Sequence, residues 1–293
     1  MSSVSCCILV NSCSKYKYIL HPFFTMLRRW WPNCDIPIYL ACDGDLKEYR
    51  DAYHIHIIEQ DEDYGFVEGR IHALELLEEY PFVIMLQDDF IIERFVDNTL
   101  IHQLITIIAN SYHTENPKIM DDSNAEDNSS QIPIACIRLM PCPGPKGNVH
   151  SFSINSSSSV LRLGEFEKNC WCRFSFQAAI WSRTYYIRFF KELKEDITSN
   201  IYKAYDKDMA DAIISDPVYW KKIWFQSNLA ENKYGCDFSL RYPERMLGVI
   251  RDGEYANAVY RSPIPYRPTA IVRGKVEEWA KELFKREKID IKI

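Results

Sequence analysis

The chain has 293 residues and a formal net charge of −6; 47% of its residues are hydrophobic and 26% are charged. These proportions are those of an ordinary soluble globular protein, and the length fits one large domain or two small ones with a substantial core. Because the net charge is negative and the basic residues are scattered, the composition argues against nucleic-acid binding, and no nucleic-acid partner is expected.

Two further features bear on the location of the protein. Residues 1–4 lead straight into a predicted strand, without the basic segment and long apolar segment of a secretory signal. No stretch of the sequence approaches the roughly 20 apolar residues that cross a bilayer. We therefore expect a cytoplasmic protein without a membrane span, and the sequence leaves its oligomeric state open.

The ten cysteines are expected to be reduced, because a chain of this length without a secretory signal does not need a disulfide framework. Several of them lie in apolar runs and should behave as small core residues. Cys170 and Cys172 are separated by one residue. No second pair completes the ligand spacing of a zinc site.

Strands and helices alternate in the first part of the chain. Apolar runs predict strands at 4–10, 36–41, 55–58 and 82–86. Helical spacing of apolar residues predicts helices at 21–30, 65–79 and 97–110. This alternation favours a parallel sheet built from right-handed crossovers.

The second part of the chain is less regular. Residues 111–131 are polar and predict a surface loop. The elements predicted after this loop are strands at 132–139, 160–163, 174–181 and 246–250, and helices at 184–193, 206–234 and 275–286. Because no internal repeat or linker interrupts the chain, we expect one domain, 1–293, made of two halves, 1–110 and 132–293.

An acidic pair follows the strongly apolar strand around which the chain is organised. The run from Phe82 to Leu86 predicts a strand buried on both faces, and Asp88 and Asp89 come directly after it. Ligands of open α/β sheets bind outside the carboxyl ends of strands. Two neighbouring carboxylates there suit Mg²⁺ or Mn²⁺. The alternative is that Asp88 caps a turn and Asp89 faces water.

Four segments resemble one family, whereas the common dinucleotide, phosphate-loop, hydrolase and zinc-protease signatures are absent. Residues 10–40 resemble the opening of soluble GT-A fold glycosyltransferases of bacterial surface-polysaccharide clusters and large algal viruses. Residues 87–90 are similar to the family's metal motif, and 175–181 to its S-x-Q-x-x-I-W segment. Residues 230–235 are similar to its acidic residue followed by glycine. The resemblance implies an α/β, Rossmann-like domain with a mostly parallel central sheet flanked by helices.

The resemblance also implies an activity and a set of sites. The activity is metal-dependent transfer of a sugar from a nucleoside-diphosphate sugar, with a UDP-sugar favoured, to a glycan hydroxyl with inversion. The first half would bind the donor and the second half, with the C-terminal helix, the acceptor. Asp88 and Asp89 would hold Mn²⁺ or Mg²⁺ on the diphosphate. The remaining donor-site residues would be Asn11, Ser12, Lys15, Asp43, Arg70, Gln177 and Trp181.

Two of these assignments have structural alternatives. Arg70 is placed to contact a phosphate through its guanidinium fork, or it is an ordinary surface arginine. Gln177 and Trp181 would lie near the sugar or the acceptor, and Trp181 is alternatively a core residue, because aromatic residues at strand ends usually pack.

An inverting transferase needs a carboxylate base beside the acceptor hydroxyl. Glu231 is the first choice, followed by Asp208 and Asp211, and each is alternatively a solvated helix acid. Ala230 stands where the family usually places an aromatic residue, and a retaining enzyme would need no such base. Two rival functions remain: a sugar nucleotidyltransferase, and a non-catalytic protein of the same fold that binds a nucleotide or glycan.

Overall fold

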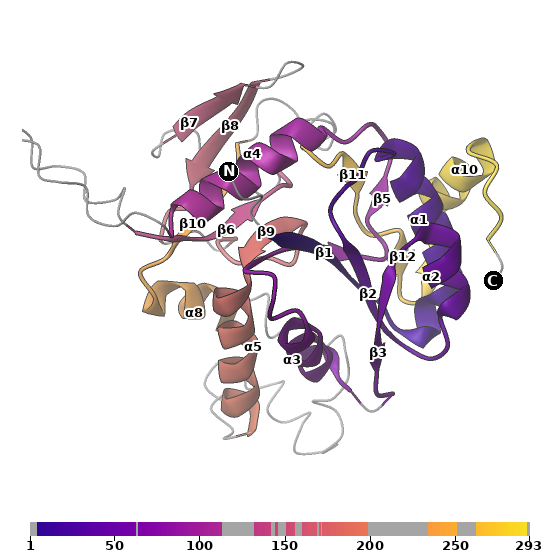
Figure 1. Cartoon of the computed structure of the whole chain (residues 1–293), viewed down its shortest axis with the longest axis horizontal. Coiled ribbons are helices and arrows are strands. Elements are labelled where there is room, and N and C mark those ends of the chain that lie inside the picture. The colour runs from indigo at the N-terminus through magenta and orange to yellow at the C-terminus, as the bar shows by residue number, and fades with distance from the viewer. Residues whose placement is uncertain are drawn as a thin grey trace, which may run out of the picture.

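A nine-stranded sheet forms the centre of the protein, with the strand order β3-β2-β1-β4-β9-β6-β10-β8-β7 (Figure 1). The computed structural model describes residues 5–62, 64–112, 132–141, 144–145, 151–155, 160–168, 170, 172–198, 234–250 and 262–291. The strands of the sheet are β1 (Cys6–Asn11), β2 (Ile38–Asp43), β3 (His56–Gln60), β4 (Phe82–Gln87), β6 (Ile134–Arg138), β7 (Ser151–Asn155), β8 (Val160–Glu165), β9 (Ala179–Ser182) and β10 (Arg245–Val249).

Most strands of this sheet run in the same direction. The pairs β1–β2, β2–β3, β1–β4 and β6–β10 are parallel. Strand β9 is antiparallel to β4 and to β6, and β8 is antiparallel to β10 and to β7. Following these pairings across the sheet leaves β8 and β9 opposed to the other strands. The predicted fold class, a Rossmann-like α/β domain with a mostly parallel central sheet flanked by helices, is confirmed.

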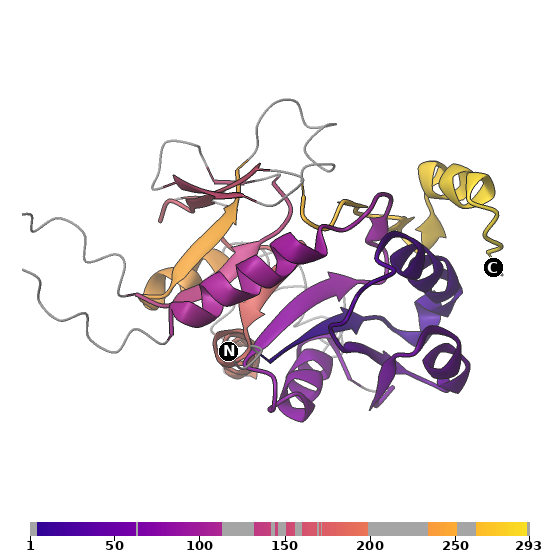
Figure 2. The same cartoon turned by 45° about the horizontal axis from the view of Figure 1, so that its top comes forward.

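Helices cover both faces of the sheet. The side chains of each strand alternate between the two faces, so apolar residues on both faces have to be covered. In β1, Ile8 and Val10 belong to one core cluster, and Cys7 and Leu9 to the other. The first cluster includes residues of α1 (Lys17–Trp30), α2 (Lys47–Tyr53), α4 (Asn98–Asn110) and α10 (Glu278–Arg286). The second cluster includes residues of α3 (Phe66–Leu76), α5 (Arg183–Thr198) and α8 (Gly235–Arg241). Figure 2 shows α4 lying across the sheet.

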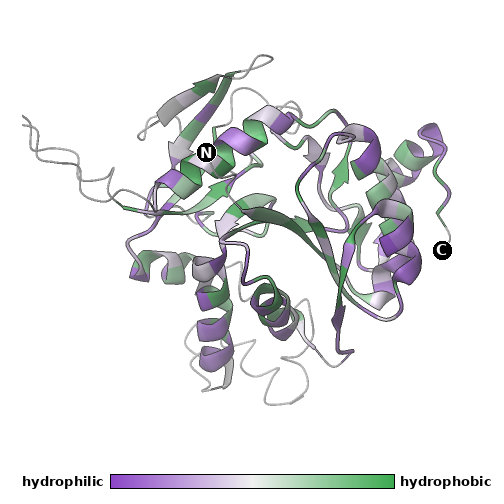
Figure 3. Ribbon diagram, viewed as in Figure 1, coloured by the Kyte–Doolittle hydropathy of each residue, from purple (hydrophilic) through white to green (hydrophobic). Residues whose placement is uncertain are grey.

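Hydropathy follows these layers. The central strands are hydrophobic along most of their length, whereas the helices carry hydrophilic residues on part of their surface (Figure 3). Strand β4 is buried at its first five positions, as expected for a strand covered on both faces. No helix in the described part of the chain is long and apolar enough to cross a membrane.

The structure corrects the bounds of several predicted elements. The helix predicted at 275–286 is α10, which begins at Glu278, because Lys275 and Val276 form β13. Helix α1 begins at Lys17, after a short 3₁₀ turn η1 (Ser14–Tyr16), so that Pro22 lies inside the helix and not in its first turn. The strand predicted at 174–181 is reduced to β9 (Ala179–Ser182), and just before it the N–H of Ala178 donates a hydrogen bond to the hydroxyl of Tyr266 at 3.0 Å. The predicted elements within 113–131 and 206–233 lie outside the described residues.

The C-terminal segment adds strands that the sequence did not indicate. Strand β11 (Tyr266–Arg267) pairs with β5 (Ile91–Ile92), just after the acidic pair. Strands β12 (Ile271–Val272) and β13 (Lys275–Val276) form a hairpin. Its two turn residues, Arg273 and Gly274, have φ values of 51° and 76°, as a type I′ turn requires. This segment brings the C-terminal part of the chain against the end of β4.

Candidate functional site

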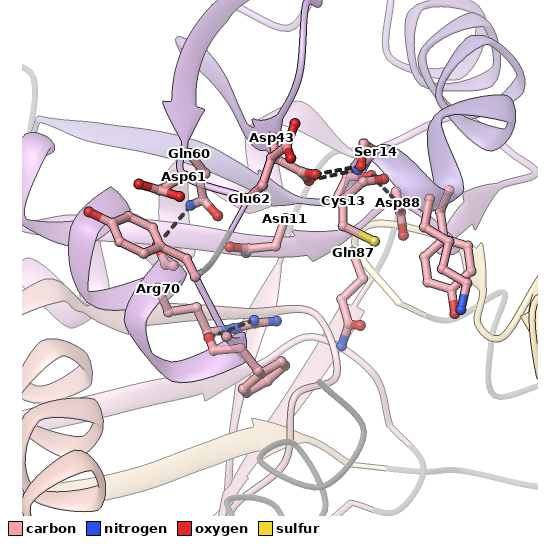
Figure 4. Close-up of a pocket in the computed structure, with 17 residues that line it drawn as sticks. Asn11, Cys13, Ser14, Asp43, Gln60, Asp61, Glu62, Arg70, Gln87 and Asp88 are labelled. Atoms are coloured by element: carbon pink, nitrogen blue, oxygen red, sulfur yellow. Dashed lines mark hydrogen bonds between the residues drawn. The ribbon is translucent and has the colours of Figure 1, made fainter. Parts of the chain in front are cut away.

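A pocket of about 300 Å³ opens where β1, β2, β3 and β4 end (Figure 4). Strand register explains its position: Asn11 lies opposite Ala41 and Gln87, and Asp43 lies opposite Gln60, so the four strands end at one edge. This is the edge at which open α/β sheets bind ligands. The residues that line the pocket are Asn11, Ser12, Cys13, Ser14, Lys15, Tyr16, Asp43, Gln60, Asp61, Glu62, Tyr64, Gly65, Phe66, Gly69, Arg70, Gln87 and Asp88.

The loop after β1 is held against the end of β2. The carboxylate of Asp43 accepts hydrogen bonds from the Ser14 N–H, at 2.7 Å, and from the Ser14 hydroxyl. Ser12 is also held to β2, because its N–H donates to the carbonyl of Ala41 at 3.0 Å. Lys15 is exposed at the pocket. The predicted pocket residues Asn11, Ser12, Lys15 and Asp43 therefore lie together.

Asn11 offers the pocket a hydrogen-bond donor. Its side-chain Nδ2 is buried and has no hydrogen-bond partner among the described residues. Because a buried amide without a partner costs free energy, a ligand that accepts this hydrogen bond would be favoured at this point.

Asp88 is buried at the end of β4, 7% exposed, and it also lines the pocket. The hydroxyl of Ser12 donates to its Oδ2 at 2.5 Å. Burial, with the charge of Asp89 as the next cause, raises the pKa of Asp88 to about 7, although the Ser12 hydrogen bond acts to lower it. A carboxylate that is ionised at such a cost would be stabilised by a bound cation.

Asp89 faces the C-terminal segment. Its carboxylate accepts a hydrogen bond from the N–H of Ile271, and its carbonyl accepts one from Ala270 at 3.1 Å. The side-chain Oδ1 is buried and has no hydrogen-bond partner among the described residues. Burial raises the pKa of Asp89 to about 6.

A divalent ion at the acidic pair would have to keep exchangeable ligands. The part of the chain that the structure describes contains no group of three or more His, Cys, Asp or Glu side chains that could enclose a metal. Asp88 and Asp89 supply two carboxylates, and Oδ1 of Asp89 has no hydrogen-bond partner among the described residues. Mg²⁺ is commonly held by one or two carboxylates together with water and substrate phosphates. A closed structural metal site would need more protein ligands.

Arg70 is a buried residue of the pocket wall and not an ordinary surface arginine. It is 7% exposed, and its guanidinium lies 3.4 Å from the centre of the Phe66 ring. Nη1 donates to the carbonyl of Phe66 at 3.3 Å, whereas Nε has no partner among the described residues. Burial lowers the pKa of Arg70 to about 10. Arg70 thus remains cationic at neutral pH and can meet an anionic ligand.

The structure places the other two predicted donor-site residues differently. Gln177 accepts a hydrogen bond from the hydroxyl of Tyr266 at 2.7 Å and does not line the pocket. Trp181 is 1% exposed, and its ring stacks on Tyr186 at 4.5 Å. Trp181 is therefore a core residue, the alternative that its position at a strand end favoured. Glu231, Asp208 and Asp211 lie outside the described residues.

Several pocket residues were not predicted as site residues. Gln60 ends β3, and its Nε2 donates to the carbonyl of Gly69 at 2.8 Å. The acidic run 59–63, at the carboxyl end of a predicted parallel strand, is the sequence signal that could have identified this part of the wall. Tyr266 and Ile271 carry no such signal, because they reach the site only through contacts between distant segments.

No protein-family model and no curated protein matches the chain. Solved structures resemble it weakly. A cytidylyltransferase from Leptospira borgpetersenii serovar Hardjo-bovis is 7% identical, with a TM-score of 0.41 over 97% of this chain and 95% of that chain. TarS of S. aureus is 14% identical, with a TM-score of 0.28 over 41% of this chain and 24% of TarS.

A putative nucleotide-diphospho-sugar transferase from Desulfovibrio desulfuricans is also 14% identical, with a TM-score of 0.27. That match covers 37% of this chain and 55% of the other. The chain thus spans about a quarter of TarS and about half of the putative transferase. With such identities and TM-scores, these likenesses assign no residue and no activity.

Buried carboxyls predict how stability depends on pH. The folded-state pKa values of Asp88 and Asp89 lie above the ordinary value for aspartate, about 4. The folded protein therefore binds more protons than the unfolded chain in this interval, and stability is lost as pH rises through the folded pKa values. Without added metal, the melting temperature should fall between about pH 4 and about pH 7 from this cause.

Asp88→Asn should reduce that fall and raise the melting temperature at pH 8 by several degrees. Asp51→Asn, the same change at an exposed residue of α2, is the matched control and should keep the wild-type pH profile. Differential scanning fluorimetry across the pH range measures both. A profile of Asp88→Asn that parallels the wild type would contradict the assigned cause.

Trp181→Ala should lower the free energy of unfolding by about 3–5 kcal/mol, because it leaves a cavity in an aromatic cluster. Trp279→Ala, on the partly exposed face of α10, should cost less. Urea denaturation measures the two losses. Unchanged stability of Trp181→Ala together with weaker ligand binding would instead make the ring a binding surface.

Proposed function

We propose that the protein is a glycosyltransferase that moves a sugar from a nucleoside-diphosphate sugar to a glycan hydroxyl and depends on Mn²⁺ or Mg²⁺. The observation that carries this proposal is the acidic pair at the carboxyl edge of the parallel strands, in which Asp88 is buried and lines the pocket and Asp89 beside it is partly buried. Because desolvation raises the pKa values of both carboxyls, a bound cation would favour their ionised forms. A metal diphosphate supplies that cation as part of the ligand.

The pocket wall supports the nucleotide part of the donor. It offers the amide of Asn11, whose Nδ2 has no partner within the described part of the chain, the carboxylate of Asp43 and the ring of Tyr64. These groups can bind an uncharged nucleoside by hydrogen bonds and by packing against its flat base. The pocket volume of about 300 Å³ lies at the lower end of the range for ligand pockets. A UDP-sugar is the donor that we propose.

The charges along the wall support the placement of the diphosphate. The cations Lys15 and Arg70 border the same pocket as Asp88. Asp88 and Asp89 would hold the metal, whose chemistry there is to neutralise the charge that grows on the leaving diphosphate. Arg70, which keeps its charge when buried, would pair with an anionic oxygen of the donor.

Inversion at the sugar carbon needs a general base on the acceptor side. Glu231 is the proposed base, with Asp208 and Asp211 as the alternatives. The base would take the proton of the acceptor hydroxyl as the new glycosidic bond forms, while the bond between the sugar and the diphosphate breaks. We propose that residues 1–110 bind the donor and residues 132–293 bind the acceptor.

Metal-dependent nucleotide binding is the first test. UDP should raise the melting temperature when Mn²⁺ is present. The rise should be much smaller when excess EDTA is added to remove the Mn²⁺, because the acidic pair cannot hold a diphosphate without a cation. Parallel titrations with GDP, CDP and UTP show which nucleotide base the protein prefers and whether it prefers two phosphates to three. If no nucleoside diphosphate stabilises the protein in a metal-dependent way, the proposal is wrong.

The reaction itself separates the rival functions. A glycosyltransferase releases a nucleoside diphosphate from a nucleotide sugar, whereas a sugar nucleotidyltransferase consumes a nucleoside triphosphate and releases pyrophosphate. A binding protein of the same fold would show the metal-dependent shift without turnover. Chromatography of the nucleotide products, after incubation with Mn²⁺ and a panel of nucleotide sugars, distinguishes these three outcomes.

Removing one metal ligand should abolish turnover with little loss of folding. Asp89→Asn should slow hydrolysis or transfer of the nucleotide sugar by about 100-fold or more, since metal stabilisation of a leaving group is worth several kcal/mol. Asp51→Asn is again the control for the same chemical change at an exposed site. Wild-type turnover by Asp89→Asn would show that the pair does not hold a catalytic metal.

A further inference from the structure

Two cysteines on a tight turn lie unusually close together. Sγ of Cys170 and Sγ of Cys172 are 2.7 Å apart. The turn is closed by main-chain hydrogen bonds, from the Cys170 N–H to the Glu167 carbonyl at 3.0 Å and from the Arg173 N–H to the Cys170 carbonyl at 3.0 Å. Both cysteines are reduced in the structure. Their sulfur atoms lie within an ångström of the bond length of a disulfide, about 2.0 Å.

Two buried arginines hold this turn in place. Nη2 of Arg138 donates to the carbonyls of Cys172, at 2.6 Å, and of Arg173, at 3.0 Å. The guanidinium of Arg173 donates in turn to the carbonyl of Phe166 at 2.6 Å. Arg138 and Arg173 are 1% and 4% exposed. Because buried charge-assisted hydrogen bonds are costly to break, the turn cannot readily open to separate the two sulfur atoms.

The two thiols differ in their access to solvent. Cys170 is partly exposed, whereas Cys172 is 5% exposed. Burial, reinforced by the neighbouring Cys170, raises the pKa of Cys172 to about 12. A dissolved oxidant therefore reacts first with Cys170, and the adjacent Cys172 supplies the second thiol.

We propose that Cys170 and Cys172 are a redox modification site at which a hydroperoxide forms a reversible intramolecular disulfide. The sulfur of Cys170 attacks the peroxide oxygen, which breaks the O–O bond, releases water or an alcohol, and leaves a sulfenic acid. The sulfur of Cys172 then displaces the hydroxyl of that sulfenic acid, so that the S–S bond forms and a second water leaves. The two thiols supply the two electrons that reduce the peroxide, and the site does not depend on the proposed function.

A third thiol defines the competing product. Sγ of Cys236, on α8, lies 3.9 Å from the carbonyl oxygen of Cys170. Cys236 is partly exposed and comes from a distant segment. A disulfide between Cys170 and Cys236 would cross-link two segments of the chain, whereas the proposed disulfide closes within the turn.

Tryptic digestion separates these products, because cleavage after Lys168 and Arg173 releases the peptide 169–173 with both cysteines. The full-length folded protein is treated with hydrogen peroxide, alkylated with iodoacetamide and digested. The proposal expects an unalkylated 169–173 peptide that is about 2 Da lighter than the reduced peptide and is restored by dithiothreitol. A doubly alkylated 169–173 peptide after oxidation, or one cross-linked to the peptide 234–241, would overturn it.

Variants and a peptide control test whether the fold sets up the reaction. Cys170→Ser should abolish the light peptide, whereas Cys34→Ser, at a partly exposed cysteine elsewhere, should leave its yield unchanged. A synthetic peptide of residues 169–173 should form the disulfide at least about tenfold more slowly than the folded protein, because the fold holds the thiols in contact. Equal rates in the peptide and the protein would overturn the role of the turn.

Discussion

The cost of desolvating two adjacent carboxyls at the end of β4 is the constraint on which the site depends. Asp88 and Asp89 follow a strand that is covered on both faces; Asp88 is buried and Asp89 is partly buried. Desolvation disfavours their charged forms, and each carboxylate adds to the difficulty of ionising a near neighbour. The surrounding structure supplies hydrogen-bond donors to both, from opposite ends of the chain.

These donors explain why distant segments meet at this point. Ser12, on the loop after β1, donates to Asp88, and the same loop is fixed to the end of β2 by Asp43. Ile271, on the C-terminal hairpin, donates to Asp89. Strand register aligns β1 with β4, so the first donor follows from the sheet itself. The second follows only from the C-terminal segment, which pairs β11 with β5.

Local pattern predicted the part of the site that the sheet creates. The apolar run before Asp88 identified β4, and alternation of strands and helices placed the loop at 11–15 and Asp43 at the same edge. Burial of Arg70 was not predictable, because it depends on the packing of Phe66 and Tyr186 around the guanidinium. The contacts of Tyr266 and Ile271 link residues that are far apart in sequence, and no local period or motif encodes them.

Tyr266 joins the two sides of the site. Its ring stacks on Phe90 at 4.6 Å, and its hydroxyl accepts a hydrogen bond from the Ala178 N–H and donates one to Gln177. The side chain is fully buried, and a buried phenol is tolerated when its hydroxyl is hydrogen-bonded. The turn after β4 is therefore held by the contact between the rings of Phe90 and Tyr266, whereas the segment before β9 is held by hydrogen bonds to the Tyr266 hydroxyl. A phenylalanine at this position would keep the first contact and lose the second, which is why the hydroxyl matters for the shape of the site as well as the ring.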